Sequence, residues 1–167
     1  YKNFESHYLS GLLQLNSSLP LVKNNTDYQS ILSPKIALKI SPDFTKNKKD
    51  SFTRLDVNNI YGLNRLASEE SLEGGMSLTF GNEYKRISKK DSRENIVFKL
   101  ANNIRLKENE DLPTTNQMGL KTSNLFGEIS FNPNQFFTTK YNFSKRNNFD
   151  DITYESIDTT FNLGNFV

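Results

Sequence analysis

Apolar and polar residues alternate with a period of two along most of this 167-residue chain. Such alternation is typical of strands with two unlike faces. In one clear example, Met76, Leu78 and Phe80 share a face, and Ser77 and Thr79 share the opposite one. Helical periodicity is almost absent, so the sequence predicts an all-β, antiparallel fold. The pattern predicts about eight strands, near 8–16, 31–41, 52–61, 74–86, 94–107, 117–132, 135–146 and 151–164.

The length of the alternating runs favours a membrane location. The runs at 94–107 and 117–132 reach or exceed the about 9 to 11 residues that a tilted strand needs to cross a bilayer. Strands of soluble proteins cluster near about 5 to 6 residues. No run of about 18 apolar residues predicts a transmembrane helix. A transmembrane β-barrel is the other structure that satisfies every backbone polar group in lipid.

Composition fits such a barrel and excludes several kinds of chemistry. Only 35% of the residues are hydrophobic, although aromatic residues reach 12%, as expected when one face of each strand is apolar and the other faces a polar lumen. The net charge of +2 argues against a nucleic-acid partner. The chain has no cysteine, and His7 is its one histidine, so we predict no metal site, no cofactor and no catalytic triad.

The connections between the predicted strands differ in length. Residues 132–135 (Asn-Pro-Asn-Gln) have strong turn chemistry. Short turns of outer-membrane barrels face the periplasm, and longer loops face outward. If 132–135 is periplasmic, strand counting also places 87–93 inside, and it places 62–73, 108–116 and 146–151 outside.

Two smaller features of the pattern also give predictions. A short helix is the strongest candidate for local helical structure, over residues 68–72. The parity of the apolar face shifts between Leu120 and Leu125, and again between Tyr154 and Ile157. Each shift predicts a bulge or a bend in a strand.

The most specific segment of the chain runs from Tyr61 to Ser68, with the sequence Tyr-Gly-Leu-Asn-Arg-Leu-Ala-Ser, and is followed by Glu73-Gly74-Gly75. It resembles a segment of the lipopolysaccharide-assembly outer-membrane protein family, LptD (organic solvent tolerance protein). Asn64 stands where that family has an acidic residue. Three further parts resemble alphaproteobacterial members in the same order: 31–36 with 40–42, then 103–107, and then 127–134.

The resemblance implies that residues 1–167 are part of an outer-membrane β-barrel, about eight strands of a larger barrel. It implies a non-enzymatic role in inserting lipopolysaccharide into the outer leaflet of the bacterial outer membrane. The implied partners are lipopolysaccharide, an LptE-like lipoprotein plug, an LptA-like periplasmic bridge and membrane lipids. The residues of the lateral gate cannot be assigned to positions of this chain.

Within the motif, Arg65 has two interpretations. It could bind a substrate phosphate, since arginine binds phosphate with two hydrogen bonds. The favoured interpretation is structural, with Arg65 paired to a carboxylate such as Glu73. Gly74 and Gly75 are predicted to mark a strand start or a bend, because no phosphate-loop pattern follows them.

Two other functions also fit the alternating pattern. A porin-like diffusion barrel would share every strand feature. A soluble β-sandwich that binds carbohydrate would place the polar faces in water and the apolar faces in a dry interior between two sheets.

Overall fold

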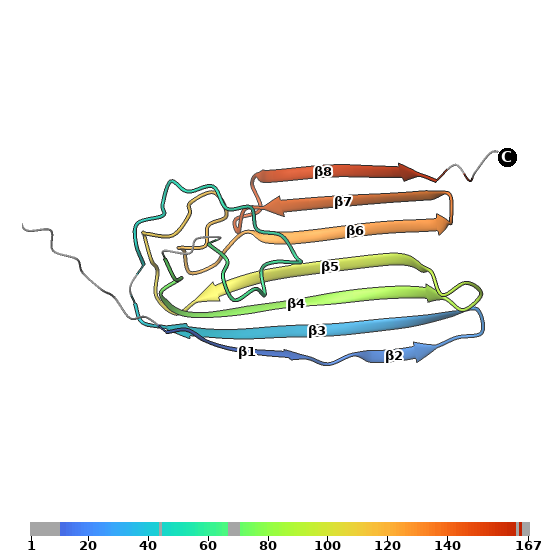
Figure 1. Cartoon of the computed structure of the whole chain (residues 1–167), viewed down its shortest axis with the longest axis horizontal. Coiled ribbons are helices and arrows are strands. Elements are labelled where there is room, and N and C mark those ends of the chain that lie inside the picture. Colours follow the sequence, from blue (N-terminus) through green and yellow to red (C-terminus); the bar gives the residue numbers. More distant parts are fainter. Residues whose placement is uncertain (1–10, 44, 67–70, 163, 165–167) are drawn as a thin grey trace, which may run out of the picture.

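The computed structural model describes residues 11–43, 45–66, 71–162 and 164. They form one antiparallel sheet, so the predicted all-β, antiparallel fold is confirmed, and the sheet is open (Figure 1). The strand order is β1-β3-β4-β5-β6-β7-β8, with β2 also beside β3. Among the described residues, no helix is long and apolar enough to cross a membrane. The strands are β1 (Leu13–Ser18), β2 (Leu21–Asn24), β3 (Tyr28–Ser41), β4 (Gly75–Ser88), β5 (Glu94–Arg105), β6 (Leu125–Asn134), β7 (Phe137–Lys145) and β8 (Ile152–Phe161).

Two of the predicted strands are wrong in whole or in part. Residues 52–61 form no strand, because Asp56 accepts hydrogen bonds from the backbone N–H groups of Asn58 (2.7 Å) and Asn59 (3.0 Å) and folds the chain into a turn. Residues 117–124 are also mostly irregular, and β6 begins only at Leu125. The parity shift before Leu125 therefore marks the end of a loop and not a bulge within a strand.

The strand β2 is absent from the sequence prediction. Ser18 faces Lys35, and Leu21 faces Leu32, so β1 and β2 pair with β3 in one continuous register. Pro20 lies between them and lacks the N–H that a ladder needs. Proline therefore divides one long edge strand into two short ones.

The second predicted bulge lies close to its expected position. The register between β7 and β8 shifts between Ser144 and Lys145, which leaves Thr153 as the extra residue. Tyr154 faces Ser144 on the polar face of the sheet. The shift was expected between Tyr154 and Ile157. The helix predicted over 68–72 falls largely on residues 67–70, which lie outside the described part of the chain.

The two ends of the sheet have different connections (Figure 1). At one end, β2–β3, β4–β5 and β6–β7 are joined by short turns. At the other end lie the long segments 42–74 and 106–124 and the shorter 146–151. The predicted grouping of 62–73, 108–116 and 146–151 at one end is thus confirmed. Because 52–61 is not a strand, 42–51 lies at this long-loop end too.

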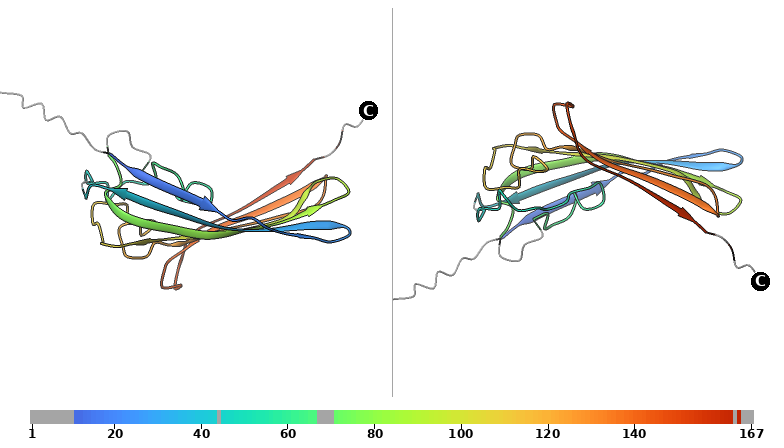
Figure 2. Two further views of the ribbon diagram at one scale, coloured as in Figure 1. Left: turned by 90° about the horizontal axis from the view of Figure 1, so that it is seen from below. Right: turned by 90° about the horizontal axis from the view of Figure 1, so that it is seen from above.

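The sheet is strongly twisted, and its two edge strands run in clearly different directions (Figure 2). Right-handed twist of this kind accumulates across sheets of many strands. The pairing register places the alternating residues on two consistent faces. Ile36, for example, lies beside Phe80 on the apolar face, and Lys39 lies beside Ser77 on the polar face. We call these the outward and the inward face.

The hydrophobic core lies on the inward face, at the long-loop end. The described parts of the long segments 42–74 and 106–124 fold back over β4, β5 and β6 there, and their apolar residues meet the few apolar residues that point inward (Figure 1). Each residue of the core is at most 6% exposed. Its members are Leu55, Val57, Ile60, Leu66, Ala101, Leu112, Met118 and Phe126.

Candidate functional site

The outward face is predominantly apolar, and no second layer of described residues covers it. Its apolar side chains are partly or largely exposed, up to 72% for Ile157, which is unusual for the apolar face of a soluble sheet. The described residues form one sheet and not two facing sheets, so the β-sandwich alternative is wrong. By register, the outward face contains Leu13, Leu15, Leu32, Ile36, Leu38, Ile40, Met76, Leu78, Phe80, Tyr84, Ile96, Phe98, Leu100, Ile104, Ile129, Phe131, Tyr141, Phe143, Ile157 and Phe161.

A buried group of charges holds the motif segment on the inward face. We call it the anchor cluster: Lys39 of β3, Arg65, Glu73 and Arg105 of β5. The Glu73 carboxylate accepts hydrogen bonds from Arg65 Nε at 2.7 Å and Arg105 Nη1 at 2.7 Å, and Lys39 Nζ lies 3.3 Å away. Arg65 Nη2 also pairs with Glu73. All four residues are at most 3% exposed. The structural interpretation of Arg65 is therefore confirmed, with Glu73 as its partner.

The remaining donors of Arg65 are also satisfied by the inward face. Its Nη1 donates to Thr79 at 3.0 Å and to Asn103 at 2.9 Å, and its Nη2 donates to Ser77 at 2.9 Å. These three partners come from β4 and β5. With every donor engaged inside the protein, Arg65 has none left for a substrate phosphate.

The backbone of the motif is fixed in the same place. Lys39 Nζ donates to the carbonyl oxygens of Gly62 at 3.0 Å and Leu63 at 2.9 Å. The Tyr61 hydroxyl lies directly over Gly81 of β4, where any side chain would collide with it. The Tyr-Gly-Leu-Asn-Arg sequence of residues 61–65 thus contacts a lysine, a carboxylate and the backbone of β4 at Gly81.

Electrostatics stabilise the anchor cluster over a wide pH range. Burial alone would raise the pKa of Glu73, but the charges of Arg65, Lys39 and Arg105 outweigh it and hold this pKa at about 2. Glu73 is therefore ionised at any physiological pH. Gly75, which begins β4 with a φ of 89°, confirms the predicted glycine strand start.

Residues 52–61, which we call the crossing segment, run over the inward face from one edge of the sheet to the other. At the first edge, Gln14 Nε2 of β1 donates to the Tyr61 carbonyl at 2.6 Å. At the other edge, the Arg54 guanidinium lies 3.8 Å from the centre of the Tyr154 ring of β8. The segment therefore connects β1 with β8 although no strand pairing joins them.

Halfway across, the crossing segment meets a row of charges. We call it the charge row: Lys35, Glu83, Lys99 and Glu128, one from each of β3 to β6. Lys35 pairs with Glu83, Glu83 lies opposite Lys99, and Lys99 Nζ lies 2.9 Å from Glu128. The Asn58 amide bridges the last two, because it donates to Glu128 at 3.1 Å and accepts from Lys99 at 2.8 Å.

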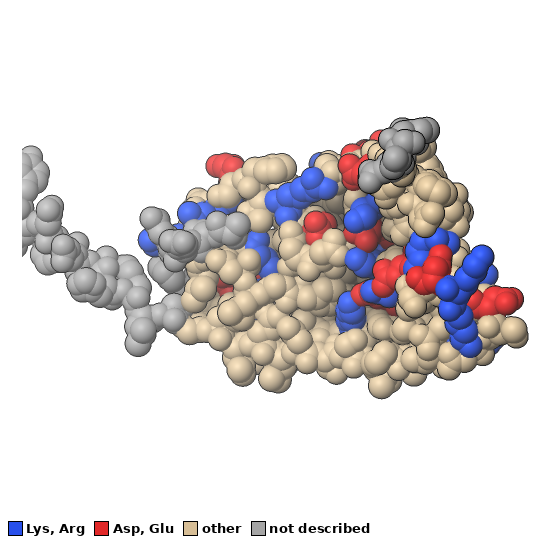
Figure 3. Space-filling model, turned by 45° about the vertical axis from the view of Figure 1, so that its right-hand side comes forward, with Lys and Arg blue, Asp and Glu red and all other residues tan. Residues whose placement is uncertain are grey.

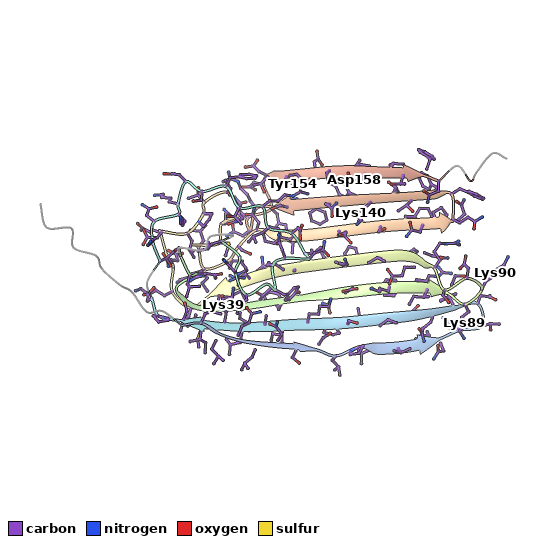
Figure 4. The ribbon with its side chains drawn as sticks, in the orientation of Figure 1. Lys39, Lys89, Lys90, Lys140, Tyr154 and Asp158 are labelled. Carbon is purple, nitrogen blue, oxygen red and sulfur yellow. The ribbon has the colours of Figure 1, made fainter. Side chains whose placement is uncertain are left out.

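A groove of about 380 Å³ with charged side chains in its lining opens beside this contact. Lys35, Glu83 and Lys99 line it from the sheet, and Asn58 and Tyr61 line it from the crossing segment. Beyond the groove, the inward face is open toward the short turns, and acidic and basic side chains gather there together (Figure 3). In this part of the molecule, Lys140 of β7 lies opposite Asp158 of β8 (Figure 4).

What the described residues present on both sides of the sheet is surface rather than an enclosed pocket. Among the described residues, no three histidine or acidic side chains are close enough to hold a metal ion. The sheet has an exposed apolar outward face and a charged inward face, and a hydrophobic core lies under the long loops. The sequence predicted both faces. It did not predict that Lys39 and Arg105 converge on Glu73, because that convergence depends on strand register.

The family comparison agrees with this architecture. The model of the family "LptD: LPS transport system D" matches residues 5–166, almost the entire chain. No curated protein matches the chain.

Proposed function

This chain belongs to the LptD family of the lipopolysaccharide transport system, an outer-membrane family of Gram-negative bacteria, and we propose that it forms part of the barrel wall that delivers lipopolysaccharide to the outer leaflet. The observation that carries the proposal is the division of one sheet into an apolar outward face and a charged inward face. Residues 1–167 would all belong to this barrel segment.

In this role, the outward face contacts the acyl chains of membrane lipids. The inward face receives the sugar and phosphate headgroup of lipopolysaccharide, since Lys35 and Lys99 present ammonium groups at the groove. The task is translocation, and no covalent bond forms or breaks. An LptE-like lipoprotein plug would occupy the lumen, and an LptA-like bridge would supply substrate from the periplasm.

The orientation follows from the two ends of the sheet. Short turns of outer-membrane barrels face the periplasm, so the long-loop end faces the cell exterior. A single Asp111→Cys substitution tests this, because the chain has no other cysteine. We expect a membrane-impermeant maleimide to label residue 111 on intact cells. Labelling only after the outer membrane is permeabilised would reverse the orientation.

The transport role is tested by photo-crosslinking in living cells. A photoreactive amino acid replaces Lys35 in the groove, Phe98 on the outward face or, as a control, Lys121 in the long-loop segment. We expect a lipopolysaccharide adduct at position 35 that disappears when the supply of lipopolysaccharide is stopped. An adduct of equal strength at all three positions, or at none, would contradict the proposal.

A porin-like diffusion barrel predicts a different result in planar bilayers. The long segments, which include the crossing segment, cover the inward face at the long-loop end, so we expect low ion conductance from the full-length protein. High, stable conductance together with no adduct at position 35 would favour passive diffusion instead.

A further inference from the structure

A second polar site lies on the outward face, at the short-turn end. It is a hollow of about 510 Å³, lined by residues that include Asp27, Tyr28, Arg86, Lys89, Lys90 and Asn95. Figure 4 shows Lys89 and Lys90 at this end of the sheet, far from the anchor residue Lys39. The hollow is separate from the groove that the transport proposal uses.

Arg86 reaches the hollow from the outward face. It lies opposite Ser30 of β3 and Ile96 of β5, on the same face of β4 as Phe80 and Tyr84. Its guanidinium lies 3.9 Å from the centre of the Tyr28 ring. An arginine stacked on a tyrosine at the rim of an apolar face is suited to the interface between acyl chains and lipid headgroups.

A bulge brings unpaired polar atoms to this place. The register between β4 and β5 shifts between Arg86 and Ile87, and Asn95 is the extra residue. The buried atoms Arg86 Nε and Asn95 Oδ1 have no hydrogen-bond partner in the protein. One is a donor and the other an acceptor, so together they match a ligand with an anionic oxygen beside a hydroxyl or ammonium group.

The charge of the hollow favours an anion. Arg86, Lys89 and Lys90 contribute three positive charges and Asp27 one negative charge, a net of +2. None of the three cations forms an ion pair with another described residue, whereas neighbouring Lys85 pairs with Glu94 at 2.8 Å and Arg93 pairs with Asp91 at 2.6 Å. Among the cations of residues 85–93, the ones without an ion pair are therefore those that line the hollow.

We propose that this hollow binds the headgroup phosphate of a phospholipid from the leaflet at the short-turn end. The acyl chains would lie along the neighbouring outward-facing residues Tyr84, Ile96 and Phe98. The phosphate would accept from Arg86 Nε and the two lysines, and the terminal hydroxyl or ammonium group would donate to Asn95 Oδ1. This inference rests on the lipid-facing position of the outward face.

Native mass spectrometry of the full-length protein in detergent tests the site. Phosphatidylglycerol and diacylglycerol with the same acyl chains serve as probes, because only the first carries a phosphate. The variants are Arg86→Gln and Lys89→Gln/Lys90→Gln, and the control is Lys140→Gln on the inward face. We expect phosphatidylglycerol retention to fall about tenfold in Arg86→Gln, with diacylglycerol retention unchanged. The control should retain both lipids like the unmodified protein.

The possible outcomes separate this site from the function proposed above. Equal phosphatidylglycerol retention in Arg86→Gln and the unmodified protein overturns the site alone. Displacement of the lipid by millimolar inorganic phosphate shows a free-anion site and overturns the headgroup assignment, as does competition by an acidic peptide. Retention of neither lipid by any form, the control included, overturns the lipid-facing surface itself. Folding of each variant is checked by its heat-dependent mobility on gels.

Discussion

The inward face has two halves, built from the same strands, that differ in how deeply their charged residues are buried. At the long-loop end, charged residues such as Glu73 and Arg105 are buried beneath loops and paired with one another. In the half toward the short turns, Lys35 and Lys85 keep about a third of their side chains exposed, and no loop covers their ion pairs with Glu83 and Glu94 among the described residues. Burial, more than charge content, decides whether a strand residue holds a loop in place or presents a surface to a solute.

The contrast predicts very different costs for removing a carboxylate from each half. We expect Glu73→Gln to lower the free energy of unfolding by about 3 to 5 kcal/mol, because three cations are left buried without their partner. Glu94→Gln, which removes an exposed partner of Lys85, should cost less than about 1 kcal/mol. Urea unfolding followed by gel mobility measures both, and equal costs would contradict the comparison.

The pH dependence of unfolding tests the buried half of the inward face. The pKa of Glu73 is lowered from its ordinary 4.5 to about 2, so its contribution is present above pH 4.5 and is lost as the pH falls through 2. For a shift of this size we expect a loss of about 3 kcal/mol. The difference in unfolding free energy between the unmodified protein and Glu73→Gln should therefore shrink between pH 4.5 and 2. A difference independent of pH would contradict the role of this carboxylate.

The outward face gives a third comparison, with lipid in place of loops. Phe98→Arg should cost about 2 to 4 kcal/mol if the residue lies near the bilayer midplane. Asn142→Arg adds the same side chain to the inward face, opposite Glu128, and should be tolerated. Unfolding from lipid vesicles measures both variants. A well-tolerated arginine at position 98 would argue against a lipid-facing outward surface.

The last comparison concerns the contact between Tyr61 of the motif and Gly81 of β4. A methyl group at Gly81 would collide with the Leu100 carbonyl and the Tyr61 hydroxyl, so Gly81→Ala should cost about 1 to 3 kcal/mol. Gly11→Ala is the matched control, since nothing lies within 4 Å of its new methyl group. Trypsin cleavage at Arg54, compared between the two variants, shows whether the crossing segment has left the sheet.

The alternation of apolar and polar residues in the sequence predicted the two faces of the strands. It did not predict contacts between residues that are far apart along the chain. Alternation identified both faces of β3 to β8, because one face of each strand is apolar. Residues 52–61 were misassigned as a strand, although Asp56, Asn58 and Asn59 already signal a turn. The Arg65–Glu73 pair was predictable because its members are eight residues apart. Lys39 and Arg105 join them only through pairing of β3, β4 and β5, which no local pattern specifies.

The crossing segment has a mechanical consequence for the wall. Its contacts with Gln14 at one edge and Tyr154 at the other make it a chord beneath a curved sheet. If the sheet flattened at that level, the crossing segment would have to extend, or Arg54 would have to leave the Tyr154 ring. No chord spans the short-turn end within the described residues. The curvature of the sheet should therefore change most at the short-turn end and least at the level of the crossing segment.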